Sequence, residues 1–401
     1  MKKLLTIFAA GAMLLAGCSD KTEKQTSNDN TQSWRLVSMY NMYEPEKHGA
    51  FVADQKGMLE FLDFESMEKS PLCNDATCKH EAPKGVALEM TERDCPAYGK
   101  TNHSFLYGGK LYWFKATDFE EREDGLLSQG LQLWKGDAGG GNEKQLAEIK
   151  GLTIREFDKA LLKDGKLWTL LNSEPIDPNN VTQPSHFELV CFDLESGEYK
   201  NYGAVSEDHY SCGFWVYGEW DGKLIFHTSY SKDDKPFMEA VHEYAEKHGM
   251  SDNEAIAEYT GVMEYVMNYY EADLSTGEVK PLSTPEPACI TEKGYYYAED
   301  GRLKCTEQSG ETVELADAPD PADVQSLNGW LFYWRNGRSY LMNEQERKET
   351  EISIGDWALC WIYSDEVIYM QTKDILDENG MVIDQKVEYI KQPIAELSVK
   401  G

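Results

Sequence analysis

Basic side chains are scarce in this chain of 401 residues, which carries 39 Lys and Arg against 71 Asp and Glu and has a net charge of −32. Nucleic acids and anionic lipid surfaces bind proteins through basic patches, so this balance argues against both as ligands. The acidic residues are spread along the whole chain and are not gathered in one tail. The composition is therefore typical of a well-solvated protein surface.

The sequence also lacks the short motifs that identify common enzyme classes. It contains no Gly-x-Ser-x-Gly, no Walker loop and no dinucleotide-binding fingerprint. The run His242-Glu243-x-x-Glu246 lacks the second His of a zinc-protease helix. We therefore predict no catalytic residue and expect a protein that is not an enzyme. Four scattered histidines are expected at the surface or in a satisfied core: His103, His186, His209 and His227.

The apolar run from Leu4 to Leu15 is too short for a membrane span. It follows Lys2 and Lys3, as the apolar region of a signal peptide does. It ends in Leu15-Ala16-Gly17-Cys18, which resembles the lipobox of bacterial lipoproteins. That resemblance implies that the Cys18 thiol is acylated and that Cys18 becomes the new N-terminus. The alternative is an ordinary signal peptide that ends near a cysteine.

We thus predict a lipoprotein signal peptide over residues 1–17 and a membrane anchor, such as palmitate, on Cys18. Ser19–Ser33 contains no aliphatic or aromatic residue, so it cannot bury enough apolar surface to offset the entropy of ordering. Residues 18–33 are therefore expected to be a flexible tether with a span of about 20 Å. The predicted location is the extracytoplasmic face of the cell membrane.

The rest of the chain repeats one pattern, a turn followed by a short aliphatic and aromatic run that is typical of a β-strand. A weaker copy is Gly49–Val52. The clear copies are Gly109–Trp113, Gly165–Trp168, Gly222–Phe226, Gly294–Tyr297, Gly329–Tyr333 and Glu366–Tyr369. Once insertions such as residues 73–98 and 236–270 are subtracted, the repeat is about 40 residues long, enough for four short strands.

A second repeated element is an Asp-x-x-[Ser/Thr]-Gly-Glu turn, at Asp193–Glu198 and Asp273–Glu278, with a partial copy at Asp63–Ser66. The Asp side chain can accept from backbone N–H groups ahead of it, and Gly can adopt positive φ, so each turn reverses a strand. Residues 34–401 are therefore predicted to form an all-β fold. We expect a β-propeller of seven blades, with six as the alternative; a β-helix fits less well because its coils are shorter.

The lipobox, the Gly-Lys-Leu-Tyr-Trp type of repeat and a Cys-rich loop resemble bacterial lipoproteins with a propeller domain related to the low-density-lipoprotein-receptor type. The resemblance covers about residues 34–397. Tyr112-Trp113 and Tyr333-Trp334 are similar to that family's Tyr-Trp repeat, but the Thr-Asp pair that follows it there is absent at both places. The resemblance implies a fold and no particular activity.

One insertion, residues 236–270, has a helical texture. We expect helices over Pro236–Gly249 and Ser251–Tyr270, because Gly249 can end the first and Ser251–Glu254 resembles a capping box that opens the second. The apolar face of the second helix could pack on the propeller or could serve as a partner-binding flap.

The loop over residues 73–98 holds the best candidate site. Cys73, Cys78, His80 and Cys95 supply three thiols and one imidazole, which could close a tetrahedral zinc site. The alternative is a disulfide, Cys78–Cys95 or Cys73–Cys95, which an exported location favours. Unpaired thiols are a third possible interpretation. With zinc or with a disulfide the role is structural, because four protein ligands leave no open position for chemistry.

The other cysteines are expected in the core, with a Cys289–Cys305 bridge as an alternative. Three functions fit these features. The first is a membrane-anchored, non-enzymatic scaffold that binds a protein or other ligand. The second is a glycan-binding or carbohydrate-active propeller, suggested by an aromatic content of 12%. The third is an extracytoplasmic sensor or assembly factor that recruits a protein through the helical insertion.

Overall fold

The chain divides into two units, Met1–Ser33 and Trp34–Gly401, and only the second contains residues that the structure describes. The predicted signal peptide, Cys18 and the tether therefore lie outside the described residues. The structure is a computed structural model, and it describes residues 34–38, 42–44, 47–53, 57–73, 75, 77–80, 95, 97–98, 100, 104–121, 123, 127–154, 159–173, 183–319, 324–353, 358–376 and 382–399.

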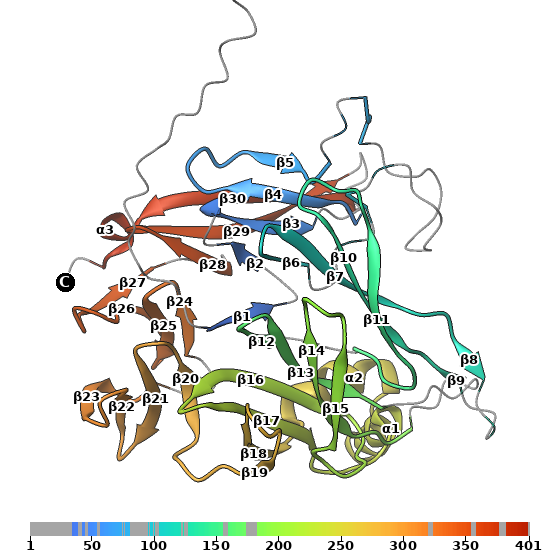
Figure 1. The fold of residues 1–401 in the computed structure, drawn as a ribbon. Helices are drawn as coiled ribbons and strands as arrows, with labels where there is room; N and C mark the ends of the chain where they lie inside the picture. The colour runs from blue at the N-terminus through green and yellow to red at the C-terminus, as the bar shows by residue number, and fades with distance from the viewer. Residues whose placement is uncertain are drawn as a thin grey trace, which may run out of the picture. The chain divides into compact units, whose positions relative to one another are not determined.

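Seven antiparallel sheets form a seven-bladed β-propeller, which confirms the predicted fold and the higher blade count. Figure 1 shows the sheets arranged around β1. The strands of blades 1 and 2 are β2 (Met42–Glu44), β3 (Gly49–Ala53), β4 (Leu59–Asp63) and β5 (Lys69–Pro71), then β6 (Phe105–Tyr107), β7 (Lys110–Ala116), β10 (Leu131–Asp137) and β11 (Lys144–Ile149). Those of blades 3 and 4 are β12 (Lys159–Lys163), β13 (Lys166–Asn172), β14 (Phe187–Asp193) and β15 (Tyr199–Ala204), then β16 (Gly213–Trp220), β17 (Lys223–Ser231), β18 (Tyr265–Asp273) and β19 (Val279–Pro281).

Blades 5 and 6 repeat the four-stranded pattern, and blade 7 has three strands. Blade 5 contains β20 (Pro287–Ile290), β21 (Gly294–Glu299), β22 (Arg302–Glu307) and β23 (Thr312–Asp317). Blades 6 and 7 contain β24 (Gln325–Leu327), β25 (Trp330–Arg335), β26 (Arg338–Asn343) and β27 (Glu349–Ile352), then β28 (Ala358–Tyr363), β29 (Glu366–Leu376) and β30 (Val382–Pro393). A separate two-stranded sheet, β8 (Glu120–Glu121) with β9 (Leu127–Ser128), lies in the connection between β7 and β10.

Each of the seven repeated runs in the sequence is the second strand of a blade. Gly109, Gly165, Gly222 and Gly329 stand in the turn before that strand, with φ between 71° and 85°. Gly tolerates this left-handed conformation, which explains why the turn residue recurs. The runs are buried on both faces because each blade packs against two neighbours, so they read as nearly continuous apolar segments.

The predicted Asp turns join the third and fourth strands of their blades. Oδ1 of Asp193 accepts from the N–H groups of Glu195 and Ser196, at 3.1 and 2.8 Å, and Gly197 has φ 80°. Asp273 and Asp63 accept from the same positions. In blade 6 Asn343 accepts in the same way, a copy that the sequence pattern missed because Asn replaces the Asp and Glu346-Arg347-Lys348 replaces Ser/Thr-Gly-Glu.

The meander order gives the ring two different ends. One end, the turn face, carries the tight turns between first and second strands and between third and fourth strands. The other end, the loop face, carries the connections between second and third strands and from one blade to the next. The long insertions all leave and re-enter the sheets at the loop face: residues 72–104, 117–130, 173–186 and 232–264.

Strand β1, Trp34–Ser38, is not part of the first blade. It pairs antiparallel with β12, the innermost strand of blade 3, with Trp34 opposite Lys163 and Ser38 opposite Lys159. The described chain therefore begins at the turn face and runs along the centre of the ring (Figure 1). Arg35 fixes β1 there, because its guanidinium contacts Glu44 at 3.0 Å, and Glu44 accepts from the Leu106 N–H at 2.8 Å.

The ring closes without exchange of strands between its ends, since blade 1 uses only N-terminal strands and blade 7 only C-terminal ones. Side chains close it instead: Phe64 of blade 1 packs against Trp361 and Tyr363 of blade 7. Within the described residues blade 7 has three strands, and the short helix α3 (Ile394–Leu397) buries Ile394 and Leu397 in the cluster between blades 6 and 7.

The helical insertion is confirmed in part. Helix α1 spans Phe237–His248 and ends at Gly249, which has φ 68°, and α2 spans Asp252–Val262. The predicted capping box is present, since Glu254 accepts from the Ser251 N–H at 2.9 Å. The expected continuation of the second helix to Tyr270 is wrong: the last residues of that range belong to β18, because Val266 and Met267 alternate across a strand. No helix in the described part of the chain is long and apolar enough to cross a membrane.

Candidate functional site

The four predicted ligand residues of the Cys/His loop meet at one point. Their ligand atoms, the Sγ atoms of Cys73, Cys78 and Cys95 and a ring nitrogen of His80, all lie within 4.8 Å of one another. Sγ of Cys95 is 3.6 Å from Nδ1 of His80. Zinc bonds of about 2.3 Å to sulfur and about 2.0 Å to nitrogen, at the tetrahedral angle, put those two atoms about 3.5 Å apart. The spacing is therefore that of neighbouring ligands on one metal ion.

Strand β4 holds both ends of this loop. The Leu59 carbonyl accepts from the Leu72 N–H at 3.0 Å, and the Leu59 N–H donates to the Ala97 carbonyl at 2.9 Å. Cys73 and Cys95 are thereby held beside the same strand, although 21 residues separate them in sequence. The central part of the loop, residues 81–94, lies outside the described residues.

A tight turn places the other two ligands. Oδ1 of Asp75 accepts from the Thr77 N–H at 2.8 Å, and the Asp75 carbonyl accepts from the Cys78 N–H at 3.0 Å. His80 has φ 52°, and its carbonyl accepts from the Tyr98 hydroxyl at 3.3 Å. This left-handed residue turns the chain back, so that the imidazole faces the three thiols.

The surroundings of Cys95 set its chemistry. Burial raises the pKa of the Cys95 thiol to about 11 without a metal, while a hydrogen bond from the Ala97 N–H acts in the opposite direction by favouring the thiolate. A bound cation would overcome the effect of burial on the Cys95 pKa, since a coordinating thiol is deprotonated. All four ligands come from the protein, so the arrangement leaves no open position for a substrate.

The cysteines that the structure describes are all unbridged. The proposed Cys289–Cys305 bridge is absent, because both residues lie opposite Tyr296, one on the strand at each side of β21. Burial raises the pKa of Cys305 to about 11 and that of Cys191 to about 12, so these thiols are protonated core residues, as expected.

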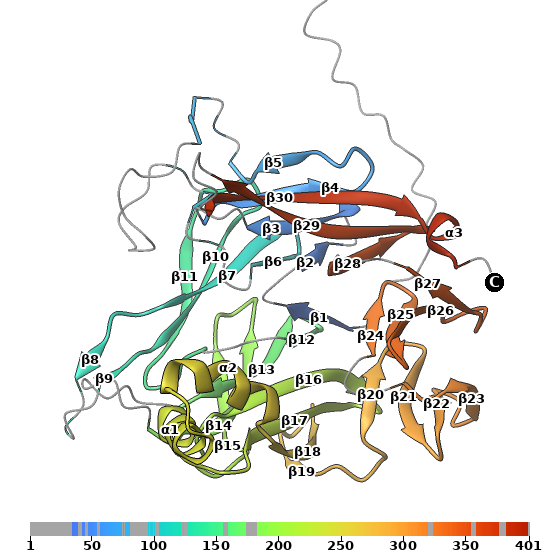
Figure 2. The same cartoon turned by 180° about the vertical axis from the view of Figure 1, so that it is seen from behind.

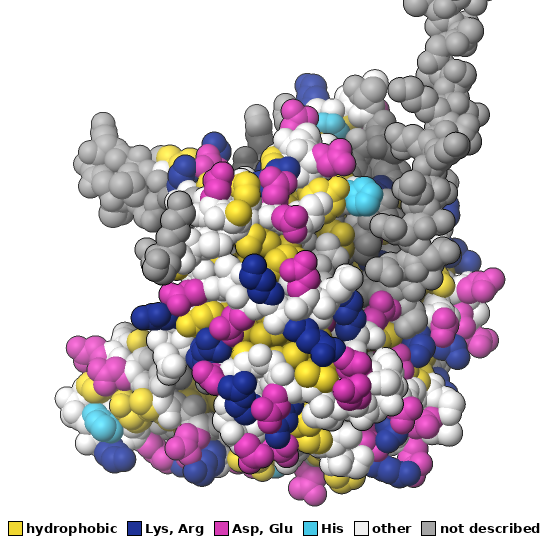
Figure 3. All heavy atoms as spheres, turned by 90° about the vertical axis from the view of Figure 1, so that its left-hand side faces the viewer, with side chains coloured by type: hydrophobic (Ala, Val, Ile, Leu, Met, Phe, Trp, Pro, Cys, Tyr) yellow, Lys and Arg dark blue, Asp and Glu magenta, His cyan; other side chains and the backbone are white. Residues whose placement is uncertain are grey.

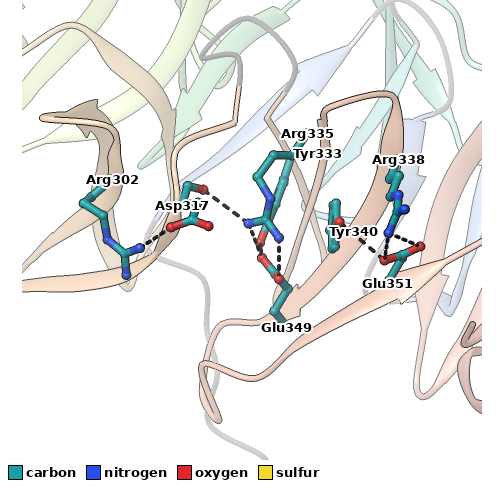
Figure 4. Close-up of polar contacts among 8 residues, drawn as sticks. All are labelled: Arg302, Asp317, Tyr333, Arg335, Arg338, Tyr340, Glu349 and Glu351. Carbon is teal, nitrogen blue, oxygen red and sulfur yellow. Dashed lines mark hydrogen bonds and ion pairs between the residues drawn. The ribbon is translucent and has the colours of Figure 1, made fainter. Parts of the chain in front are cut away.

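A second concave site lies on the loop face between blades 5 and 6, with a volume of about 430 Å³. Figure 4 shows its charged residues paired with one another. Arg335 donates to both oxygens of Glu349 at 2.8 Å and lies 4.2 Å from the centre of the Tyr340 ring, while Arg302 pairs with Asp317. The hydrogen bonds to Glu349 are the main cause that raises the pKa of Arg335 above its ordinary value. Each guanidinium here already has a carboxylate partner.

Acidic and basic side chains are paired in the same way over the outside of blades 5 to 7. Figure 3 shows acidic and basic side chains interspersed on this side, without a large patch of one sign. Arg338 with Glu351 and Lys391 with Glu366 are among its ion pairs, at 3.2 and 2.9 Å. Such exposed pairs favour solubility and contribute little stability.

His186 and its neighbours form a constellation that the sequence did not reveal. Its Nδ1 lies 2.9 Å from Ser173 Oγ and 2.6 Å from Asp208, and its Nε2 lies 3.2 Å from Glu188. Burial acts to lower the pKa of His186, but hydrogen bonds to Asp208 and Glu188 outweigh it, and the net direction is upward. Ser173 and Asp208 share one ring nitrogen, Nδ1, and Glu188 contacts the other. In a Ser-His-Asp triad the serine and the carboxylate contact opposite nitrogens, so this group ties loops together in a different geometry.

No protein-family model matches the chain, and the comparison with curated proteins gives no match. Several solved structures are similar to it at low sequence identity. The propeller domain of the Trilobed protease from Pyrococcus furiosus is 10% identical, with a TM-score of 0.34, and covers 86% of this chain and 90% of that one. An oligogalacturonate lyase from Vibrio parahaemolyticus is 13% identical, with a TM-score of 0.33, over 74% and 82%. Dipeptidyl peptidase 4 from Porphyromonas gingivalis is 11% identical, with a TM-score of 0.34, over 85% of this chain and 50% of that one, so this chain spans about half of its length.

Proposed function

We propose that the protein is a lipid-anchored extracytoplasmic lipoprotein whose propeller is a non-enzymatic binding scaffold. The observation that carries the scaffold role is the segregation of the long insertions to the loop face, while the described chain begins at Trp34 on the turn face. In this proposal the ligand binds at the loop face, the end of the ring opposite to Trp34. The support for the anchor is the N-terminal sequence, in which a signal-peptide core ends at Ala16-Gly17-Cys18.

The anchor is tested by labelling cells with palmitate. Wild type and a Ser19→Ala control should take up label and sediment with membranes, and Cys18→Ala should do neither. Continued labelling of Cys18→Ala would overturn the anchor, because no other cysteine has the small residues that precede Cys18 in a lipobox.

We also propose that Cys73, Cys78, His80 and Cys95 hold one structural zinc ion. The support is the convergence of three sulfurs and one nitrogen at ligand spacing, with the Ala97 N–H directed at a sulfur. Such a donor set prefers zinc among common divalent ions, and its closed shell gives stability to a loop with little core of its own.

Metal analysis with intact mass spectrometry tests the zinc site. Protein purified under reducing conditions should contain one zinc per chain. Cys78→Ser and Cys95→Ser should lose it, and the Cys212→Ser control should keep it, because Cys212 lies outside the cluster. A metal-free chain whose non-reduced mass is lower by two hydrogens would show a disulfide in place of the ion.

A further inference from the structure

Strand β18 extends past its blade at the loop face. It pairs along its whole length with β17 on one side. On the other side β19 pairs only with Tyr270–Ala272, and the Leu282 N–H adds a last bond to the Tyr269 carbonyl at 3.0 Å. Among the residues that the structure describes, no strand pairs with the outer edge of Val266–Asn268.

The backbone of Met267 points outward at this edge. In an antiparallel strand the N–H and C=O groups of alternate residues face the same side. The Tyr269 carbonyl faces β19, so the N–H and C=O of Met267 also face away from β17. The Met267 side chain is 48% exposed. Among the residues that the structure describes, none pairs with this N–H or C=O, so a donor, an acceptor and an apolar side chain are presented together.

Natural proteins protect exposed edges with Lys, Pro, a bulge or a covering segment. The segment 265–270 has none of these in its sequence, Tyr-Val-Met-Asn-Tyr-Tyr, and its pairing with β17 is regular. Met238 and Val262, in the helical insertion that precedes β18 in the chain, are also exposed, by 51% and 58%. The buried side chains of the two helices pack in a cluster of their own, so these apolar residues are not needed to hold the helices together.

The helical insertion that leads into β18 is acidic. Residues 232–264, which hold both helices, contain nine Asp and Glu against three Lys. Figure 2 shows α1 and α2 in front of the blades. In the chain, α2 is followed directly by β18. A second copy of the chain would bring a second acidic hairpin to the same place, and this repulsion disfavours it.

We propose that the edge of β18 at Val266–Asn268, together with the acidic helical hairpin, binds an extended basic segment of another protein. The segment adds as a strand, with backbone hydrogen bonds to Met267, apolar side chains toward Met238 and Val262, and Lys or Arg toward the hairpin. Strand addition of this kind takes its affinity from main-chain bonds and its specificity from alternate side chains. The inference rests on the proposed scaffold role and names its class of partner.

The test is a titration of the purified full chain with capped peptides of about nine residues, the length of a short added strand, followed by fluorescence anisotropy. One probe alternates Lys with Val, and the second alternates Glu with Val. The Lys peptide should bind at least about tenfold more tightly than the Glu peptide, and the difference should shrink as salt is raised.

Two variants report on the edge. Met267→Pro removes the outward N–H and leaves the bonds to β17 intact, and Met267→Lys repels the probe without a change in the backbone. Each should weaken binding of the Lys peptide about tenfold. Ile375→Lys, at another exposed apolar residue, should leave it unchanged. An unchanged urea midpoint checks that Met267→Pro still folds, and Met267→Lys serves as the test if it does not.

Equal binding of the two peptides, or full binding by both Met267 variants, would overturn the proposal. Self-association that Met267→Lys abolishes would make a second copy the occupant and would also overturn it. The titration uses neither the lipid nor the metal. Failure here therefore leaves the anchor and the zinc site standing, and failure of the anchor or zinc experiments does not alter the peptide result.

Discussion

Replacing His227 by asparagine should reduce the loss of folding stability that this protein undergoes in mild acid. His227 lies on β17 between Tyr217 and Tyr269, and its Nδ1 is 2.9 Å from the Tyr217 hydroxyl. Burial lowers the pKa of His227 to about 4, from an ordinary value of about 6.5. The folded protein therefore keeps this ring neutral at a pH where the unfolded chain binds a proton.

The size of the effect follows from that difference. As the pH falls through about 6.5, the unfolded state gains a proton that the folded state does not take up until about pH 4, so the folded state loses relative stability over this interval. A difference of roughly two and a half pH units corresponds to roughly 3 kcal/mol. Typical unfolding free energies are about 5–15 kcal/mol, so one buried ring accounts for a measurable share.

The assay is urea unfolding at pH 7 and pH 4, followed by tryptophan fluorescence. His227→Asn keeps an acceptor for the Tyr217 hydroxyl but cannot titrate. It should cost about 1–2 kcal/mol at pH 7 through lost ring contacts, and its further loss between pH 7 and pH 4 should be about 3 kcal/mol smaller than that of the wild type.

The control is His242→Asn on helix α1. Its hydrogen bond to Asp252 raises the pKa of His242, so its protonation stabilises the folded state below neutral pH. Its removal should make the acid-induced loss slightly larger, opposite in sign to His227→Asn. Equal acid-induced losses in the wild type and His227→Asn would refute the assignment of a neutral, buried His227.

Three further predictions concern the centre of the ring, the blade 5–6 junction and the metal. Gly218→Ala should cost about 1–3 kcal/mol in urea unfolding, because φ is +146° and the new Cβ would lie 2.6 Å from the Trp34 ring; the cost should fall when Trp34→Ala is also present. Arg335→Met should cost about 2 kcal/mol because it leaves the half-buried Glu349 without its charged partner, and adding Glu349→Met should recover most of it. Chelation of zinc should lower the thermal midpoint of the wild type and leave that of Cys95→Ser unchanged.

Local sequence predicted those features that local physics determines. The second strand of every blade could be found because its turn, its branched and aromatic residues and its burial on both faces all lie within one short run. The turn at Asp193 and the capping box at Ser251 were found for the same reason: donor and acceptor are two or three residues apart. The metal candidate was named from residue types alone, and the fold brings all four ligands together.

Features that depend on distant partners were decided only by the tertiary structure. Nothing near Trp34 shows that β1 pairs with Lys163 at the centre of the ring, because that contact depends on the free edge of β12. The second helix was predicted too long because apolar residues of an exposed strand also suit a helical face, and only β17 selects the strand. The His186 group likewise draws on three separate segments. The sequence by itself determined the turns and the second strands, because their donors, acceptors and apolar residues lie within one short run, and the lipobox at Cys18 stays a prediction from sequence. The choice of neighbours, which depends on edges and charges far apart in the chain, needed the folded ring.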